Sequence, residues 1–165
     1  MDRQTQRALI PTPVGTIQIH ATGHKLLRVE LIGHILPPTE PESEGSPLLE
    51  RIIHAIRAYL DGQQEDFQWV PLETAFLPPL HQKFYLWLRE HVPYGTTRTY
   101  GDVAAALGLH PRSVGRILAQ NPFPIVVPCH RIVAKTGLGG YSSGLKWKRF
   151  LLEVEGSFPE DLRRT

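Results

Sequence analysis

Residues 100–119, YGDVAAALGLHPRSVGRILA, decide how the second half of this chain folds. The run 100–107 predicts a short helix, 108–110 a turn, and Pro111 the first turn of a second helix that ends near Ala119. Two helices joined by a tight turn are the layout of a helix-turn-helix. Because such pairs also occur as ordinary packing elements, the layout favours contact with nucleic acid without establishing it.

The second helix of this pair separates apolar from basic side chains. Val114, Ile117 and Leu118 fall on one side and are expected to pack inward. Arg112 and Arg116, four residues apart, are expected on the exposed side, where they can straddle a phosphate backbone. This helix is therefore the candidate for nucleic-acid recognition.

The only cysteine of the chain follows shortly after, in residues 121–132, NPFPIVVPCHRI. The prolines exclude a helix, so this apolar run is predicted to be a short buried strand or extended segment that ends at Cys129. His130 and Arg131 come next, and a cationic neighbourhood lowers the pKa of a thiol. Cys129 is thus a candidate nucleophile, and a buried, inert cysteine is the alternative.

The two halves of the chain carry charges of opposite sign. Residues 1–75 hold 6 Lys and Arg against 10 Asp and Glu, whereas residues 76–165 hold 12 against 6. A basic second half is typical of a protein with an anionic partner such as nucleic acid, although a solvated basic surface is the alternative.

Composition and spacing exclude several other classes. One cysteine excludes an internal disulfide, and no cluster of Cys and His has metal-ligand spacing, so we expect no metal. No apolar stretch approaches the length of a membrane span, and the first residues lack the apolar core of a secretory signal. We therefore expect an intracellular protein without membrane contact.

The first half is expected to be a small α/β domain. Three strands are predicted from alternating apolar residues, at 8–10, 15–21 and 26–31, with a hairpin turn at 22–25. An amphipathic helix is predicted from Pro47 to Leu60, and 67–70 is a candidate fourth strand. Between them, residues 33–47 are expected to be a mobile acidic loop.

A boundary between two domains is placed in the turn-rich segment 71–79. A new helical pattern begins after it, in residues 84–92. The chain is accordingly predicted to divide into domains 1–75 and 76–165.

A last helix ends just before Glu155. Its inward positions are expected to be Trp147, Leu151 and Val154. Its outward positions are expected to be Lys146, Lys148, Arg149 and Glu153. Glu155 lies near the inward stripe, where a carboxylate needs a partner such as an imidazole; a frayed surface Glu before a terminal Gly is the alternative.

Five motifs in the second half resemble those of O6-alkylguanine-DNA alkyltransferases. They are Arg112–Gly115, Asn121–Pro122, Pro128–Arg131, Gly140–Gly144 and Leu151–Gly156. The resemblance implies an α+β fold, in which a small ribonuclease-H-like α/β domain precedes a mainly helical, winged helix-turn-helix domain. The zinc cluster of some members cannot form here, and the resemblance implies no cofactor.

The resemblance also implies the chemistry. Cys129 accepts an alkyl group from O6 of a damaged guanine in one displacement, and each molecule acts once because a thioether is not hydrolysed. His130 draws the thiol proton through a bridging water, and Glu155 completes the relay. Asn121 braces the turn that presents the cysteine.

Recognition of DNA is implied by similarity as well. The target nucleotide is flipped out of the duplex by minor-groove binding, and Arg112 fills the vacated stack. Tyr100 presses on the adjacent phosphate and offers its hydroxyl to the departing guanine. The residues assigned to DNA binding are Tyr100, Arg112, Ser113, Gly115, Arg116 and Arg131.

The alkylguanine pocket is implied to involve four residues. The backbone carbonyls of Cys129 and Ile132 read the guanine amino group, and Tyr141 with Ser142 forms the wall near O6. The expected partner is double-stranded DNA that contains O6-alkylguanine, and the protein is expected to be a cytoplasmic monomer, or nuclear in a eukaryote.

Two other functions stay open from the sequence. The first is a winged-helix DNA-binding protein whose Cys129 is merely packed. The second is a hydrolase with a Cys-His-Glu triad, which needs an oxyanion hole for which no Gly-rich donor loop is evident.

Overall fold

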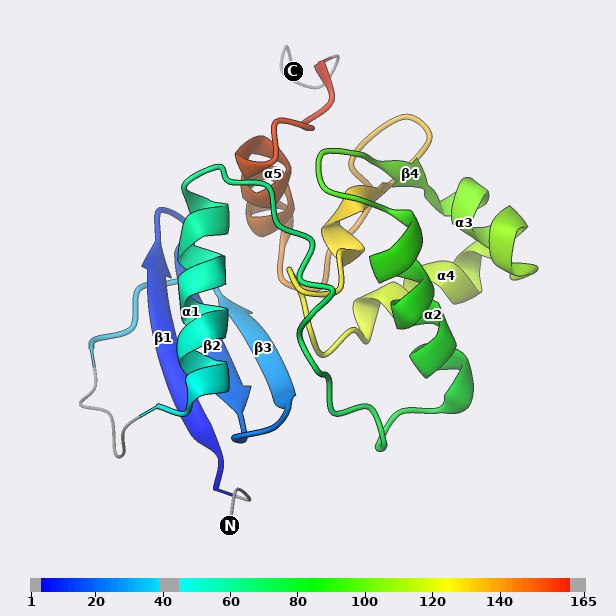
Figure 1. Cartoon of the computed structure of the whole chain (residues 1–165). Helices are drawn as coiled ribbons and strands as arrows, with labels where there is room; N and C mark the ends of the chain where they lie inside the picture. Colours follow the sequence, from blue (N-terminus) through cyan, green and yellow to red (C-terminus); the bar gives the residue numbers. More distant parts are fainter. Residues whose placement is uncertain (1–3, 39–44, 161–165) are drawn as a thin grey trace.

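A three-stranded antiparallel sheet forms the first part of the molecule, with β2 (Gly15–Ala21) between β1 (Gln6–Thr12) and β3 (Leu26–Ile32). The structure is a computed structural model that describes residues 4–38 and 45–160, so part of the predicted acidic loop lies outside the described residues. α1 (Pro47–Leu60) covers one face of the sheet (Figure 1). The predicted alternation is confirmed, because Ile17, Ile19 and Ala21 of β2 are buried whereas Gln18 and His20 between them are half-buried.

The first hairpin is tighter than the sequence predicts. β1 continues through Pro11 to Thr12, and Thr12 pairs with Gly15, so only two residues form the turn. Proline is tolerated because β1 is an edge strand that does not need every backbone donor. Gly15 has a φ of +147°, and a Cβ there would lie 1.9 Å from the carbonyl oxygen of Ile32. Only glycine fits at this position.

The predicted bounds of α1 are confirmed. Ser46 caps its first turn by accepting a hydrogen bond from the backbone N–H of Leu49 at 3.2 Å. Four side chains at three- and four-residue spacing are buried, namely Leu49, Ile52, Ile56 and Tyr59. The last of them brings a phenol hydroxyl into the interior, where it needs a partner.

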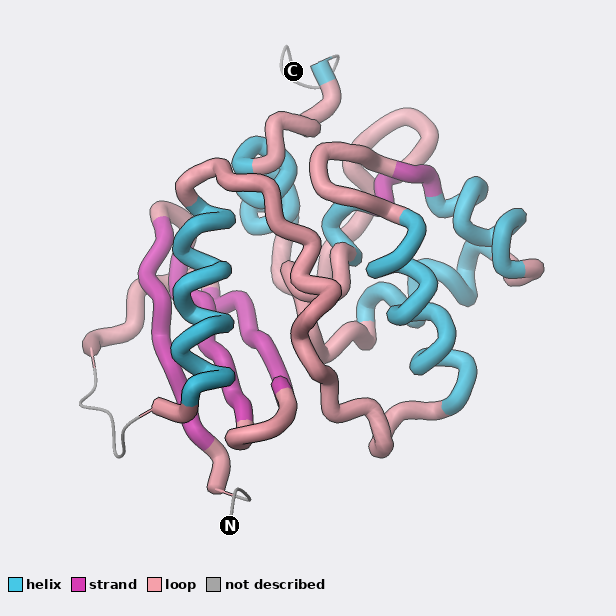
Figure 2. Tube along the Cα trace, viewed as in Figure 1, coloured by secondary structure: helices cyan, strands magenta, loops and turns pink. Residues whose placement is uncertain are grey.

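The segment that follows α1 runs as a loop between the two parts of the molecule (Figure 2). The strand predicted at 67–70 is wrong: Phe67 has a φ of +55°, and Val70 donates back to its carbonyl at 3.1 Å. Both side chains are buried in this turn rather than alternating across a strand. Further along, the segment bonds to Leu26 of β3, which donates to Pro71 O at 2.8 Å.

The second part is mainly helical. It contains α2 (Pro79–His91), α3 (Tyr100–Leu107), α4 (Pro111–Ala119) and α5 (Leu145–Val154), and a short 3₁₀ turn, η1 (Cys129–Arg131). β4 (Arg98–Thr99) pairs in parallel with β5 (Ile132–Val133) beside the helices. The predicted helix-turn-helix is confirmed as α3 and α4, with Gly108 in the left-handed conformation between them.

The fold class predicted from the sequence, α+β with a small sheet domain before a mainly helical one, is confirmed. One continuous apolar core runs through both parts of the molecule. Within residues 4–38 and 45–160, no helix is both long and apolar enough to cross a bilayer.

Candidate active site

The thiol of Cys129 is presented by a buried turn. Asn121 donates from its side-chain amide to Val127 O at 3.1 Å and accepts from the backbone N–H of Phe123 at 2.9 Å. Asn121 therefore braces the turn, as predicted. The expected strand is absent from this described segment, because Ile125 adopts a φ of +76° and the chain folds back on itself.

Cys129 lies at the edge of a cavity of about 500 Å³. Its side chain is 5 % exposed, and its Sγ donates to the hydroxyl of Tyr141 at 3.3 Å. The cavity is lined by Tyr100, Pro111, Arg112, Gly115, Leu118, Ala119, Cys129, Gly140, Tyr141 and Ser142. The helix-turn-helix and the thiol thus share one opening.

Burial raises the pKa of the Cys129 thiol above its ordinary value. Hydrogen bonds with Tyr141 and Asn121 and the charge of Lys148 lower the pKa again, but burial prevails. The sequence predicted the opposite direction from the neighbouring His130. The thiol is therefore protonated at neutral pH and needs a base before it can attack.

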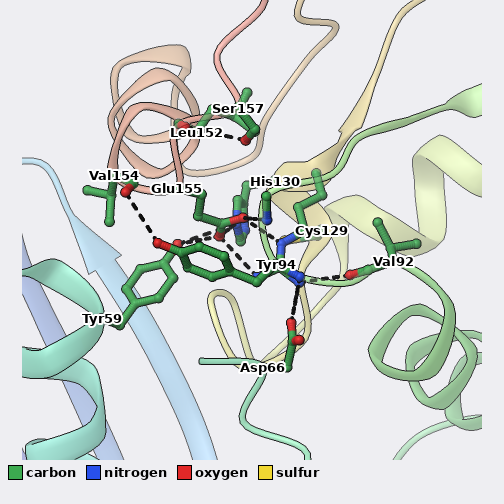
Figure 3. Close-up of polar contacts among 12 residues, drawn as sticks. Tyr59, Asp66, Val92, Tyr94, Cys129, His130, Leu152, Val154, Glu155 and Ser157 are labelled. Carbon is green, nitrogen blue, oxygen red and sulfur yellow. Dashed lines mark hydrogen bonds and ion pairs between the residues drawn. The ribbon is translucent and has the colours of Figure 1, made fainter. Parts of the chain in front are cut away.

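The two ring nitrogens of His130 have different surroundings. Nε2 lies 2.6 Å from Oε2 of Glu155, and both side chains are fully buried (Figure 3). Nδ1 is buried and has no hydrogen-bond partner among the described residues. Since Nε2 donates to the carboxylate, the lone pair of the neutral ring is on Nδ1.

Burial lowers the pKa of His130, and the Glu155 carboxylate opposes that shift. The imidazole is therefore neutral at physiological pH, as a base must be. No direct hydrogen bond joins it to Cys129 among the described residues, which fits the expected transfer through an intervening water.

Five donors surround the Glu155 carboxylate. Its Oε1 accepts from Arg131 Nε at 2.8 Å and from the backbone N–H of Gly95 at 3.2 Å. Its Oε2 accepts from His130, from Arg131 Nη2 at 3.1 Å and from the hydroxyl of Tyr59 at 2.6 Å. Burial alone would raise the pKa of this carboxyl, but the His130 and Arg131 interactions lower it below its ordinary value. Glu155 is ionised and is no frayed surface residue.

The prediction that Arg131 binds DNA is wrong. Its side chain is 2 % exposed and bonds to residues of both parts of the molecule. Besides Glu155, it bonds from Nη1 to Asp66 Oδ1 at 3.0 Å and to Val92 O at 2.8 Å. A guanidinium held by these acceptors cannot reach a phosphate.

The prediction that Lys148 points outward is also wrong. The side chain is fully buried, and its Nζ donates to Ile132 O at 2.7 Å and Gly140 O at 3.0 Å. Burial lowers the pKa of Lys148 to about 8. Ile132 does not line the cavity, and its carbonyl, expected to read the guanine amino group, keeps one lone pair beyond the bond to Lys148.

The residues of α4 lie largely as the sequence predicts. Val114, Ile117 and Leu118 are buried, and Arg116 is exposed outside the cavity lining. Arg112 is exposed at the cavity mouth. Ser113, which precedes the buried stripe, is half-buried, and Gly115 has nothing within 4 Å of where a Cβ would stand. α4 therefore presents a low, open surface beside the cavity.

Tyr100 forms another part of the cavity wall. Its hydroxyl donates to Gly140 O at 3.3 Å. Gly139 has a φ of +74°, and a Cβ there would lie 2.6 Å from the Tyr100 ring. Glycine is needed at this position so that the loop carrying Tyr141 and Ser142 can close on the ring.

Sequence reasoning missed two members of the site, Tyr59 and Asp66. Both precede the helical part of the chain. The Tyr59 hydroxyl donates to Glu155, which Figure 3 shows, and Asp66 accepts from Arg131 Nη1 at 3.0 Å. The position of Tyr59 on the apolar stripe of α1 was the available signal, because a buried phenol requires a hydrogen-bond partner.

No group of three or more His, Cys, Asp or Glu side chains that could hold a metal ion occurs in residues 4–38 and 45–160. The polar side chains around Cys129 instead bond to one another. The arrangement offers an acid–base relay behind a thiol, and a cavity in front of it.

Comparison with known proteins identifies the class to which this site belongs. Residues 79–157 match the model of the 6-O-methylguanine DNA methyltransferase, DNA binding domain, and residues 6–74 match that of its ribonuclease-like domain. The chain belongs to the 6-O-methylguanine DNA methyltransferase family.

Individual relatives agree with this assignment. A methylated-DNA–protein-cysteine methyltransferase of Methanopyrus kandleri is 43 % identical over 134 residues, which cover 81 % of this chain and 98 % of the relative. A DNA base-flipping protein of Thermus thermophilus is 38 % identical over 149 residues, 90 % of this chain and 98 % of that one. The crystal structure of Mycobacterium tuberculosis OGT in complex with DNA superposes with a TM-score of 0.76 at 29 % identity, covering 92 % of this chain and 93 % of that one.

Proposed function

We propose that this protein repairs DNA by transferring an alkyl group from O6 of guanine to Cys129, irreversibly and once per molecule. The observation that carries the proposal is the place of Cys129, between a DNA-binding helix pair with its cavity and a buried His130–Glu155 relay. As the sulfur–carbon bond forms, the bond between that carbon and O6 breaks. The thiol proton passes through water to His130. The guanine, which stays in the DNA, takes the proton of the Tyr100 hydroxyl, and the proton held by His130 returns through solvent to that hydroxyl.

The target base reaches the thiol by leaving the duplex, because no stacked base can enter a cavity whose thiol is almost buried. Arg112, exposed at the cavity mouth, fills the vacated place in the stack. α4 enters the minor groove with the small residues Ser113 and Gly115 facing the backbone, and Arg116 contacts a phosphate. Tyr100 lies against the neighbouring phosphate and offers its hydroxyl to the departing guanine.

The flipped guanine is read by groups around Cys129. The carbonyls of Cys129 and Ile132 accept from its amino group, and Tyr141 with Ser142 encloses O6. The division into domains 1–75 and 76–165 belongs to the same proposal, as does action as a monomer in the cytoplasm, or in the nucleus of a eukaryotic cell. The reaction as proposed needs no cofactor.

A second candidate function is base flipping without transfer, because one relative is described as a DNA base-flipping protein. The cavity favours transfer over this alternative, since the thiol lies in its lining and has a buried base behind it. A hydrolase with the same three residues would turn over, whereas the alkylated thiol does not.

Mass spectrometry of the intact protein tests the proposal. The protein is incubated with a duplex that contains one O6-methylguanine, and an unmodified duplex serves as the control. We expect the intact mass to rise by one methyl group, a digest to place that group on the peptide that contains Cys129, and no gain in Cys129→Ala. A protein that binds the duplex but gains no methyl group would favour base flipping alone.

A further inference from the structure

Tyr59 brings a hydroxyl from the sheet domain into the relay of the helical domain. It lies near the end of α1, its side chain is fully buried, and its hydroxyl donates to Glu155 Oε2 at 2.6 Å. The same oxygen holds His130 Nε2 at 2.6 Å, and the two donors are 3.5 Å apart. The phenol and the imidazole therefore share one carboxylate oxygen.

From this geometry, and on the basis of the function proposed above, we propose that Tyr59 is a positioning residue for alkyl transfer. Its hydroxyl fixes the Glu155 carboxylate so that Glu155 holds the His130 ring with Nε2 protonated and Nδ1 free to take the thiol proton. Tyr59 is not among the residues that line the cavity, and its hydroxyl donates to Glu155 rather than to Cys129, so it acts on the thiol only through the Glu155–His130 pair.

The sharing of Oε2 also sets how strongly the carboxylate holds a protonated ring. The hydroxyl hydrogen of Tyr59 is the positive end of a dipole, and it lies against the oxygen that faces Nε2. It therefore weakens the attraction of Glu155 for an imidazolium and keeps the base available at lower pH. Burial and the Glu155 charge raise the pKa of Tyr59, so the phenol stays protonated and remains a donor.

The other charged groups around His130 do not replace this effect. Glu155 favours the protonated ring, whereas Arg131 from η1 and Lys148 from α5 oppose it. Arg131 is fixed by its bonds to Asp66 and Val92, and Lys148 by two carbonyls. Neither can move to fill the place of a missing hydroxyl on Oε2.

The variant Tyr59→Phe removes only this hydroxyl. We expect the second-order rate constant for transfer at pH 7 to fall about tenfold, because a hydrogen bond to a charged group is lost. The loss should be equal for a duplex containing O6-methylguanine and for free O6-benzylguanine, since Tyr59 acts on the base that takes the thiol proton and not on DNA. The acid limb of the rate profile should move to higher pH by about half a unit.

Tyr94→Phe is the matched control. The Tyr94 ring packs edge-on against Tyr59 at 6.0 Å, and among the described residues its hydroxyl bonds to the carbonyls of Gly62 and Val154, at 3.4 Å each. It removes a hydroxyl from the same interface without touching Glu155, so rate and pH profile should stay as in the parent protein. A Tyr59→Phe protein with an unmoved acid limb would overturn the proposal, whatever its rate.

A measurement on the unaltered protein keeps the proposal testable if the variant does not fold. ¹⁵N NMR of His130 should show a protonated Nε2 and an unprotonated Nδ1 near pH 7. The opposite tautomer would overturn the role given to Tyr59 and Glu155. Failure of the unaltered protein to gain a methyl group from damaged duplex would instead defeat the proposed function, and the tautomer would still decide the role of Tyr59.

Discussion

The two sides of Cys129 differ in almost every physical respect. On one side lies a cavity of about 500 Å³ that is open to solvent and formed by the helical domain alone. On the other side lies a buried polar network, in which His130, Glu155 and Arg131 have almost no exposed surface. That network draws partners from both domains, including Tyr59 and Asp66.

The difference separates recognition from activation. An open, weakly bonded surface can accept a flipped nucleotide and adapt to it, whereas a base needs a fixed orientation and a fixed tautomer. The buried network holds the His130 ring in one orientation, because both carboxylate oxygens of Glu155 accept hydrogen bonds from fixed donors. Variants on the two sides should therefore fail in different ways.

The largest effect is expected from Glu155→Gln. It removes the charge that balances buried Arg131, so the free energy of unfolding should fall by about 3–5 kcal/mol, the usual result of breaking a buried ion pair. Transfer should fall at least about 100-fold because His130 loses its orientation. Urea unfolding and single-turnover kinetics measure the two losses; a stable variant would show that the carboxylate is not essential to the buried side.

Arg112→Ala should impair recognition of duplex DNA without affecting activation of the thiol. Repair of duplex DNA should slow by about 10- to 100-fold, because the flipped-out base is no longer replaced in the stack. Reaction with a free alkylguanine base should be unchanged, and so should the free energy of unfolding, since Arg112 is exposed. Equal losses on duplex and free base would contradict the separation of the two sides.

The free energy of unfolding should fall at acid pH because of the buried His130 and Glu155. The pKa values of both His130 and Glu155 are lower in the folded protein than in an unfolded chain, so the unfolded state binds more protons as pH falls. Stability should be complete above about pH 6.5, decline below it as His130 is forced to charge, and decline further below about pH 4.3 as Glu155 is protonated. Urea unfolding from about pH 8 to about pH 2.5 covers both declines, and His130→Gln should flatten the first.

The smallest effect is expected from Arg116→Ala. Arg116 is exposed and lies outside the cavity lining, so it should contribute one phosphate contact. Affinity for duplex DNA should fall a few-fold, and the slope of log affinity against log salt should decrease by about one. Transfer to a free alkylguanine base should not change. An unaltered salt slope would remove Arg116 from the DNA-binding surface.

Much of the fold could be predicted from local patterns. The hairpin of β2 and β3, the bounds of α1 and the pair α3 and α4 follow from alternation, spacing and turn residues. The strand predicted at 67–70 was wrong, and the segment before Cys129 is buried as predicted but turns back instead of extending, because Phe67 and Ile125 take left-handed conformations that apolar residues seldom adopt. Tertiary packing imposes those conformations, so no local pattern signals them.

The site was predictable only in part. Motif positions gave Cys129, His130 and Glu155, and spacing placed Arg112 at the exposed side of its helix. Arg131 and Lys148 were misplaced because Lys and Arg are rarely buried unless their charges or donors find partners. Those partners, the carboxylate of Glu155 and the carbonyl of Ile132, are distant in sequence or on another element.

By itself the sequence determined which groups are present and which local elements carry them: one thiol, a base beside it, a carboxylate at a helix end and two arginines on one helix face. Only the tertiary structure decided how these groups behave. Burial raises the pKa of the thiol, a shared carboxylate fixes the imidazole, and a tyrosine from the other domain completes the relay. The physical reason is that burial and hydrogen bonding depend on residues brought together by folding, which local sequence does not specify.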